Sequence, residues 1–251
     1  MTRIYRRRIQ IAPVGFEVDR VVLPAIREKA EKVYLMVHKD RSKDKATKYA
    51  AAIQKKLKAA NIETELVYCD WENIEEITRV ARDLILQESN NEIAINLASG
   101  SKNHAIGLDR ACMTFRKRKH IHPFYPEAEK WTAWRYPKQQ STGVKKIKQI
   151  PIHRIIVPDP ELVIALKAIK QDAVDIPMHK GRKGVKKKDL AKSLFGNSDK
   201  VSLTKLQRNI TQKLEKTWRA VEIIQVGQSD WISLNDEGKY LRYVLKNEET
   251  Y

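Results

Sequence analysis

The sequence predicts an α/β domain with a mostly parallel sheet, followed by a smaller domain of helices and a β-hairpin. Three observations lead to this fold class. The chain has 251 residues, a length typical of about two domains. In its first half, short apolar segments alternate with segments of helical periodicity, and a Pro-Asp-Pro motif at residues 158–160 then opens a different pattern. We therefore predict a first domain over residues 1–150, a linker over 151–158 and a second domain over 159–251.

Strands and helices alternate along the first domain. We expect strands at residues 8–14, 33–37, 63–68 and 93–97, and helices at 19–30, 44–60, 73–87 and 103–115. Asp19 suits the N-cap of the first helix. Strands joined by helices of this length pair in parallel, and the apolar strands lack polar alternation, so helices should cover both faces of the sheet. The predicted arrangement is Rossmann-like.

Three further strands should complete the first domain. They are expected at residues 118–125, 131–136 and 145–150, with the last two paired as a hairpin. Trp131, Trp134 and Tyr136 would form an apolar face on the hairpin. Packing against a helix or a partner subunit is favoured for these rings over stacking on a nucleic-acid base.

The second domain begins with a clear helix signal. Asp159 suits an N-cap and Pro160 the first helical position, so a helix should run to about residue 170. A loop or short strand at 174–184 and a helix at 186–194, ended by Gly196, come next. Ser202 should cap a third helix to about residue 216, before strands at 221–226 and 231–234 and a last helix from Asn235. This order of elements is that of a winged helix-turn-helix domain.

The third helix of the second domain has one apolar stripe and one polar, cationic face. Amide and cationic side chains of this kind read base edges and phosphates in the DNA major groove. We favour binding of double-stranded DNA over a winged helix that binds protein. The candidate DNA-binding residues are Lys186, Lys187, Ser202, Thr204, Lys205, Gln207, Arg208, Asn209 and Gln212.

The charge of the chain also favours an anionic partner. The formal net charge is +18 at neutral pH. Residues 1–158 carry 31 Lys and Arg against 18 Asp and Glu, which gives +13, and residues 159–251 carry 18 against 13, which gives +5. The first domain is the more basic part, so DNA binding by the second domain alone leaves most of the charge unassigned. Part of it could serve an anionic ligand of the first domain.

Composition indicates a soluble protein of a reducing compartment. No apolar run reaches the roughly 20 residues of a membrane span. The basic N-terminus lacks the apolar region and cleavage site of a signal peptide. Two cysteines, Cys69 and Cys112, give neither a disulfide framework nor a zinc-binding spacing. We expect a cytoplasmic location and no metal.

The most informative segment is the strand-turn-helix at residues 93–108. A small, polar, glycine-containing turn, Ala98–His104, follows the apolar strand, and a helical pattern begins at once. The free N–H groups and the dipole of such a helix N-terminus favour an anion, and Lys102 adds a positive charge. The spacing is not that of an ATP-hydrolysing P-loop, and after the first strand only Gly15 of a dinucleotide fingerprint is present. An ordinary turn with a solvated lysine is the alternative.

Two segments of the first domain resemble a known family. Residues 9–20 (IQIAPVGFEVDR) and 96–105 (NLASGSKNHA) resemble the CARF domain, the CRISPR-associated Rossmann fold. Together with residues 231–241 (WISLNDEGKYL), nearly the whole chain resembles archaeal CARF–winged-helix transcriptional regulators, and the HFX_2341 (DUF6293) family matches best.

The resemblance implies a homodimer whose two Rossmann domains form one symmetric pocket for a cyclic oligoadenylate. The protein would then be a ligand-responsive, DNA-binding transcriptional regulator. Lys102 and the amides near Ser101 and Asn103 would hold phosphate, and Ser99 or Asn96 a ribose or base. The implied ligand-binding residues are Val14, Gly15, Phe16, Arg20, Asn96, Ser99, Gly100, Ser101, Lys102 and Asn103.

Enzymatic alternatives have weaker support. The chain could be a ring nuclease or another nucleotide-acting enzyme that uses its winged helix for docking or dimerisation. Arg116 and His122 match the loose pattern of HEPN ribonucleases, but a strand is expected there instead of a helix. His120 and His122 share a strand face without a third metal ligand at suitable spacing. We assign no catalytic residue and no cofactor.

Overall fold

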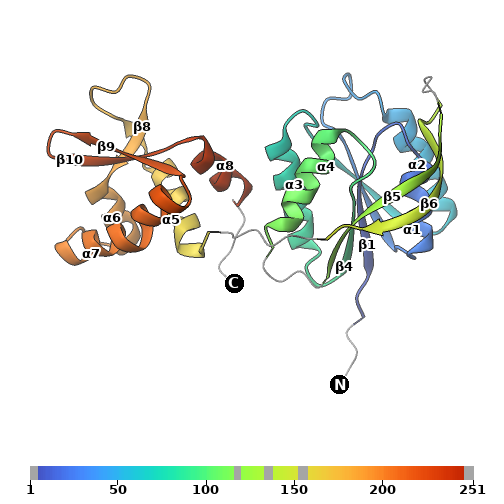
Figure 1. The fold of residues 1–251 in the computed structure, drawn as a ribbon, viewed down its shortest axis with the longest axis horizontal. Helices are drawn as coiled ribbons and strands as arrows, with labels where there is room; N and C mark the ends of the chain where they lie inside the picture. The colour runs from blue at the N-terminus through green and yellow to red at the C-terminus, as the bar shows by residue number, and fades with distance from the viewer. Residues whose placement is uncertain (1–4, 116–119, 133–137, 152–157, 246–251) are drawn as a thin grey trace. The chain divides into compact units, whose positions relative to one another are not determined.

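The computed structural model of the protein describes residues 5–115, 120–132, 138–151 and 158–245. Contacts divide the chain into two compact units, Met1–Ile156 and Val157–Tyr251 (Figure 1). We call them the N-terminal and the C-terminal unit. The predicted linker at 151–158 contains this division point, and its residues 152–157 lie outside the described ranges.

A six-stranded sheet forms the centre of the N-terminal unit. Its strands are β1 (Arg8–Pro13), β2 (Lys32–His38), β3 (Glu63–Cys69), β4 (Glu92–Asn96), β5 (Ile121–Trp131) and β6 (Ser141–Gln149), in the order β3-β2-β1-β4-β5-β6. Strands β1 to β5 pair in parallel, and β6 pairs antiparallel with β5. The predicted α/β class with a mostly parallel sheet is confirmed.

Helices cover both faces of this sheet (Figure 1). The helices α1 (Asp19–Arg27) and α2 (Thr47–Ala59) pack on one face, and α3 (Ile74–Gln87) and α4 (Lys102–Met113) on the other. Neighbouring residues of one strand therefore enter different cores: Leu35 packs in the cluster of α2 and Met36 in that of α3. The apolar strands lack alternation because both of their faces are buried.

Strands β1 and β4 are neighbours in the sheet although two other strands separate them in sequence. The chain leaves β1 toward the face of α1 and leaves β4 toward the face of α4, so the direction of winding changes between them. In open α/β sheets, ligands bind outside the carboxyl ends of the strands at such a switch point.

Two details of the N-terminal unit differ from the predictions. Asp19 is not the N-cap of α1, because that position belongs to Val18. As the first helical residue, Asp19 accepts a hydrogen bond from the Gly143 N–H (3.0 Å) and pairs with Lys56 (3.2 Å). These contacts lower the pKa of Asp19 against the opposing effect of burial. The carboxylate thus joins α1 to β6 and α2.

The predicted strand at 131–136 is the second difference. The single long strand β5 runs through residues 121–131, and its second half forms the hairpin with β6. Trp131 ends this strand with 62% of its surface exposed, so the described helices leave most of it uncovered, and packing against a partner subunit remains a prediction. Trp134 and Tyr136 lie outside the described residues.

The C-terminal unit combines helices with a small antiparallel sheet. Its elements are α5 (Pro160–Gln171), β7 (Val174–Asp175), β8 (Lys183–Lys186), α6 (Lys187–Phe195), α7 (Lys200–Lys205), the π-helical segments η1 (Leu206–Thr211) and η2 (Lys213–Thr217), β9 (Val221–Val226), β10 (Ser229–Leu234) and α8 (Asp236–Val244). The sheet order is β7-β8-β10-β9. One core joins Leu166 of α5, Leu190 of α6, Ile210 of η1 and Ile232 of β10.

The third helix of this unit begins before its predicted cap. Asp199 is the N-cap, and its carboxylate accepts a hydrogen bond from the Ser202 N–H (2.7 Å), the third position of the helix. From Leu206 the helix widens into π-helical turns, where the Thr211 hydroxyl bonds the carbonyls of Leu206 and Gln207. The predicted apolar stripe consists of Leu203, Leu206, Ile210 and Leu214; the last three are buried, and Leu203 is half-buried. Within the described ranges, no helix has the length and apolarity to cross a bilayer.

Candidate ligand-binding turn and nucleic-acid interface

The turn after β4 is organised by a reciprocal cap. The Ser101 hydroxyl accepts a hydrogen bond from the His104 N–H (3.4 Å), and His104 Nδ1 accepts one from the Ser101 N–H (3.2 Å). In this arrangement His104 takes the position that Glu or Gln usually holds in a capping box. Gly100 precedes the cap with a φ of 81°, a conformation that favours glycine.

The turns after β1 and β4 touch each other at the carboxyl edge of the sheet. A methyl group at Gly15 would lie 2.6 Å from the Gly100 nitrogen, and one at Gly100 would lie 2.8 Å from Cβ of Pro13. Both turns therefore approach as closely as glycine permits. The two segments that carry the CARF resemblance are thus neighbours at the switch point of the sheet.

Part of the β4–α4 turn is open to solvent. Gly100, Ser101 and Lys102 are exposed, and no ion pair joins Lys102 to a described residue. First-turn N–H groups have no acceptor within a helix, so those of Lys102 and Asn103 remain for solvent or a ligand. The Asn103 side chain donates to the Trp71 carbonyl (3.1 Å). Positive charge and free amides make this turn attractive to an anion.

Other predicted ligand-binding residues are engaged in the fold. Val14 is buried, and Phe16 packs against Tyr49 with 5.4 Å between ring centroids. Asn96 is fully buried, donates to the Arg20 carbonyl (2.8 Å) and accepts from the Ala98 N–H (2.9 Å). These side chains position the two turns, and a direct contact with ligand remains a prediction for them.

Arg20 is also buried, between α1 and the β5–β6 hairpin. Its Nη1 lies 2.9 Å from Glu17, and its Nε donates to the Pro126 carbonyl (2.8 Å). The guanidinium carbon is 4.8 Å from the ring centroid of Tyr125 and 5.2 Å from that of Trp131. These contacts account for most of the guanidinium and give it a structural role.

Three buried polar atoms at this edge have no hydrogen-bond partner among the residues that the structure describes. They are Arg20 Nη2, Ser99 Oγ and His104 Nε2, and the described ranges contain one more such atom, Nε of Arg242 in α8. An unsatisfied buried donor typically costs about 1–3 kcal/mol. Such groups are rare in folded proteins and call for an explanation. Their concentration at one sheet edge points to a place where a ligand supplies acceptors.

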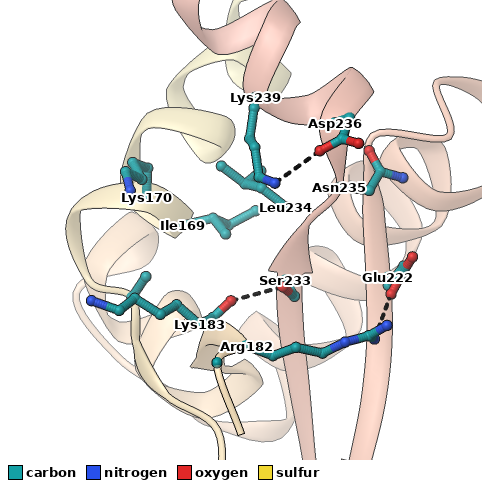
Figure 2. A pocket seen from close by; sticks show the side chains of 12 residues that line it. Ile169, Lys170, Arg182, Lys183, Glu222, Ser233, Leu234, Asn235, Asp236 and Lys239 are labelled. Atoms are coloured by element: carbon teal, nitrogen blue, oxygen red, sulfur yellow. Dashed lines mark hydrogen bonds and ion pairs between the residues drawn. The ribbon is translucent and has the colours of Figure 1, made fainter. Parts of the chain in front are cut away.

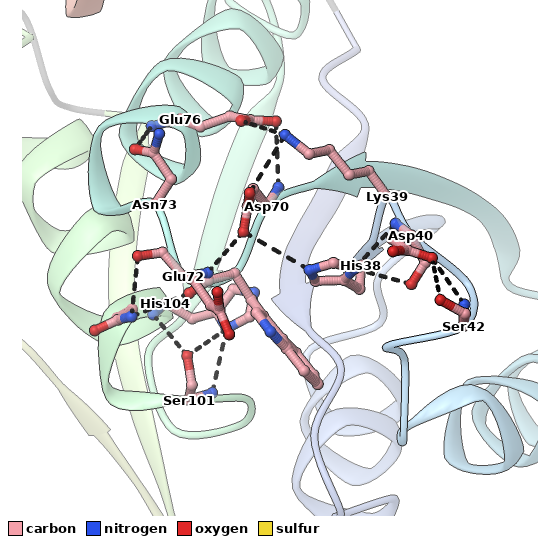
Figure 3. Close-up of polar contacts among 12 residues, drawn as sticks. His38, Lys39, Asp40, Ser42, Asp70, Glu72, Asn73, Glu76, Ser101 and His104 are labelled. Carbon is pink, nitrogen blue, oxygen red and sulfur yellow. Dashed lines mark hydrogen bonds and ion pairs between the residues drawn. The ribbon is translucent and has the colours of Figure 1, made fainter.

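Sequence reasoning did not find the polar cluster that adjoins the turn (Figure 3). His38 ends β2, is buried, and lies 3.7 Å from an Asp70 carboxylate oxygen. Trp71 packs edge-on against it, with 4.9 Å between ring centroids. Burial, and to a smaller extent His38, lower the pKa of His104 to about 4, so its imidazole is neutral near pH 7. A histidine three residues after the capping serine was the available signal for this site.

The C-terminal unit presents a cationic helix face. Two open hollows of about 470 and 520 Å³ flank α7, and both are lined by Lys200, Thr204 and Arg208. Arg208 is exposed, and no described residue forms an ion pair with it. Lys200, with Lys188 and Ser198 in the first hollow, was not among the predicted residues. These side chains form a ridge with a groove on each side.

The other predicted DNA-binding residues differ in accessibility. Ser202 is buried and donates its hydroxyl to Asn197, because Asp199 starts the helix earlier and turns Ser202 inward. A contact of Ser202 with DNA remains a prediction. Lys187 pairs with Asp230 (3.3 Å). Lys186 lies over the Trp231 ring and Lys205 over that of Phe195. Asn209 and Gln212 are exposed, and Gln207 is half-buried.

A third cavity, of about 440 Å³, lies elsewhere in the C-terminal unit (Figure 2). Ile169 and Leu234 contribute its apolar part. Its rim carries the ion pairs Arg182–Glu222 and Lys239–Asp236, both at 2.9 Å. Lys170 and Lys183 also line it and pair with no described residue. None of the predicted DNA-binding residues lines this cavity.

Of the residues weighed for enzymatic chemistry, the structure describes the histidines but not Arg116. His122 Nε2 contacts Glu92 (2.9 Å) on the neighbouring strand. No group of three or more metal-binding side chains occurs within the described ranges.

These observations define a Rossmann-like α/β unit followed by a unit of helices and a small antiparallel sheet. Residues 8–131 match the family model described as HFX_2341_N-like, N-terminal. The uncharacterized protein MJ1513 of Methanocaldococcus jannaschii is 28% identical over 188 residues. The alignment covers 65% of this chain and 56% of that protein, so the chain spans little more than half the length of this relative.

Similar folds occur among solved structures. Can2 from Sulfobacillus thermosulfidooxidans, in complex with cyclic tetra-adenylate, has a TM-score of 0.41 and 11% identity, with 93% of this chain and 61% of that chain covered. Csm6 from Enterococcus italicus, bound to a cyclic hexa-2′-fluoro-hexa-dAMP, has a TM-score of 0.38 and 13% identity, with 49% and 34% covered.

Proposed function

We propose that this protein is a ligand-responsive, DNA-binding transcriptional regulator. The N-terminal unit binds a cyclic oligoadenylate or a related nucleotide at the carboxyl edge of its sheet. The C-terminal unit is a winged helix-turn-helix domain that binds double-stranded DNA through the face of α7 and η1. Ligand binding changes the affinity for DNA.

The ligand site is supported above all by the three unpartnered polar atoms of Arg20, Ser99 and His104. They lie at the switch point of the sheet, beside the exposed Lys102 and the N-terminus of α4. A nucleotide offers what this edge lacks: phosphate oxygens for the cation and amides, and neutral oxygen and nitrogen acceptors for the buried donors. The match of residues 8–131 to the HFX_2341-like family makes a cyclic oligoadenylate the first probe.

DNA binding is supported by the order of elements and the charge of the C-terminal unit. Helix, helix, helix, hairpin and helix follow one another, and α6 and α7 enclose a turn at residues 196–199. The third helix exposes Lys200, Lys205 and Arg208 on its outer face while Leu206 and Ile210 face the core. This placement presents cations and amides to a groove and its phosphates.

A homodimer is part of the proposal. A cyclic oligonucleotide with two-fold symmetry suits an isologous interface, in which each subunit contributes the same half of the site. Helix α4 carries the turn at its N-terminus and exposes 43% of the apolar Ile106. That side chain gives the helix an apolar contact for a second copy.

The ligand site is tested by calorimetric titration of cyclic tetra-adenylate into the wild type and the Lys102→Glu variant. We expect the wild type to bind one ring per two chains. Reversing the charge beside the phosphate should weaken binding by at least about tenfold. Lys58→Glu is the matched control, because it changes the charge equally on an exposed residue near the C-terminal end of α2, away from the turn.

The control should bind as the wild type does. Loss of affinity in both variants would attribute binding to the overall charge, and wild-type affinity in Lys102→Glu would remove the turn from the site. No heat and no thermal shift with any cyclic oligoadenylate would reject this ligand class.

A further inference from the structure

His104 is held in one tautomer by the cap of α4. Its Nδ1 lies 3.2 Å from the Ser101 nitrogen and 3.0 Å from the Ser101 hydroxyl oxygen. A backbone N–H can only donate, so Nδ1 accepts it and carries no proton, and the hydroxyl then donates to Nδ1 as well. The proton of the neutral imidazole therefore lies on Nε2. This donor is buried, with 1% of the residue exposed, and has no acceptor among the described residues. The fold thus presents an oriented N–H that lacks a partner.

His104 lies between the glycine turn and the polar cluster that contains His38. Gly100 lies close to the ring: a methyl group there would be 3.0 Å from Nδ1. His38, whose charge influences His104, belongs to the cluster that also contains Trp71. Asn103 ties the carbonyl of Trp71 to the first turn of α4. The first turn of α4 therefore carries an exposed cation, Lys102, and, two residues later, the buried neutral donor of His104.

We infer that the Nε2–H of His104 binds an uncharged acceptor of the nucleotide, such as a base ring nitrogen, a base carbonyl or a ribose hydroxyl oxygen. This inference rests on the proposed function and divides its site in two. Lys102 and the free amides take phosphate, whereas His104, with Ser99 as a second unpartnered group, takes a neutral part of the ligand. The imidazole is neutral at pH 7, so Nε2 is its single N–H donor. Nε2 is buried, so a ligand reaches it only after the groups that cover it move.

Two nearly isosteric substitutions test the donor role of Nε2 separately from the acceptor role of Nδ1. In His104→Asn the amide oxygen can replace Nδ1 as the acceptor of the Ser101 N–H, but nothing replaces the Nε2 donor. In His104→Gln the amide nitrogen can replace the Nε2 donor, and the amide oxygen can still accept the Ser101 N–H, because Gln is a usual residue at this position of a capping box. A donor role predicts that Asn weakens binding of cyclic tetra-adenylate by roughly tenfold and that Gln retains it within about threefold. A purely structural role predicts that both variants bind as the wild type does, because both keep an acceptor for the Ser101 N–H.

Inorganic pyrophosphate serves as a second probe in the same titrations. It lacks neutral acceptors of a base or ribose, so its affinity should fall in Lys102→Glu and stay unchanged in His104→Asn. Equal binding of the ring by wild type and His104→Asn would overturn the inference and leave the proposed function standing. Failure of the wild type to bind the ring would reject the proposed function itself.

A measurement on the wild type avoids the risk that a variant misfolds. Nitrogen-15 NMR of the imidazoles distinguishes the tautomers and follows each ring nitrogen. We expect His104 to carry its proton on Nε2 and the Nε2 resonance to shift when cyclic tetra-adenylate is added, with little change at Nδ1. A proton on Nδ1, or an Nε2 resonance that the bound ring does not affect, would contradict the assignment.

Discussion

Replacing Glu17 by alanine should lower the free energy of unfolding of the N-terminal unit by about 3–5 kcal/mol. Glu17 and Arg20 are 5% and 2% exposed, and the carboxylate lies 2.9 Å from Nη1. The Ser141 hydroxyl donates to the same carboxylate (2.6 Å). Removing Glu17 leaves the Arg20 charge buried without its counter-ion, which is the costly way to break a buried pair. Urea unfolding followed by circular dichroism measures the change.

The double variant Glu17→Ala/Arg20→Met separates the cost of an unpaired charge from the cost of lost packing. With both charges removed, we expect it to be no less stable than Glu17→Ala, although it has lost more interactions. If the double variant is clearly less stable than Glu17→Ala, the unpaired charge of Arg20 does not account for the cost, and the assignment of a buried ion pair is wrong. A ring-binding titration of the double variant would then show whether Arg20 contacts ligand, as the sequence predicted.

Reversing two charges on the α7 ridge should nearly abolish DNA binding. In Lys200→Glu/Arg208→Glu, two cations that line both hollows beside the helix become anions. We expect the affinity for a duplex of about 30 base pairs to fall by roughly 100-fold, because each lost phosphate contact also forgoes counterion release. Fluorescence anisotropy at several salt concentrations measures both the affinity and its salt dependence.

The matched control is Lys170→Glu/Lys183→Glu, which makes the same charge change at the cavity of Figure 2. If DNA is bound by the α7 face, the control keeps most of its affinity and its salt dependence. In the ridge variant the slope of log affinity against log salt should become shallower by about two. Equal losses in both variants would indicate binding by overall charge and would contradict the assignment of α7.

Much of the fold could be predicted because its signals are local. Apolar strands without alternation indicated a sheet covered on both faces, and the cores around Leu35 and Met36 show why. Gly196 ends α6 in the left-handed conformation, as its position suggested. The errors arose where local signals compete. Asp199 and Ser202 are both good caps three residues apart, and the structure uses the earlier one. Asp19 was available as a cap but bonds β6 and α2, which no local pattern reveals.

The position of the candidate site could be predicted from the sequence, but the roles of several of its side chains could not. The sequence indicated the turn and Lys102, because a strand, a glycine and a helix start define both. It did not reveal that the Asn96 amide bonds the Arg20 carbonyl, or that the Arg20 guanidinium bonds the Pro126 carbonyl. It also did not reveal the role of His104, because that role depends on the burial of the imidazole and on which ring nitrogen accepts the Ser101 N–H. Such properties come from packing between segments distant in sequence.

The most direct test of the proposed function measures duplex affinity with and without saturating cyclic tetra-adenylate. In the wild type, the ring should change the dissociation constant for DNA by roughly fivefold or more, the usual range of coupling between two sites. In Lys102→Glu, DNA affinity should be close to that of the wild type without ring, and the ring should have no effect. If calorimetry shows the ring bound to the wild type while its DNA affinity stays the same, the two units are not coupled and the chain is not a ligand-responsive regulator.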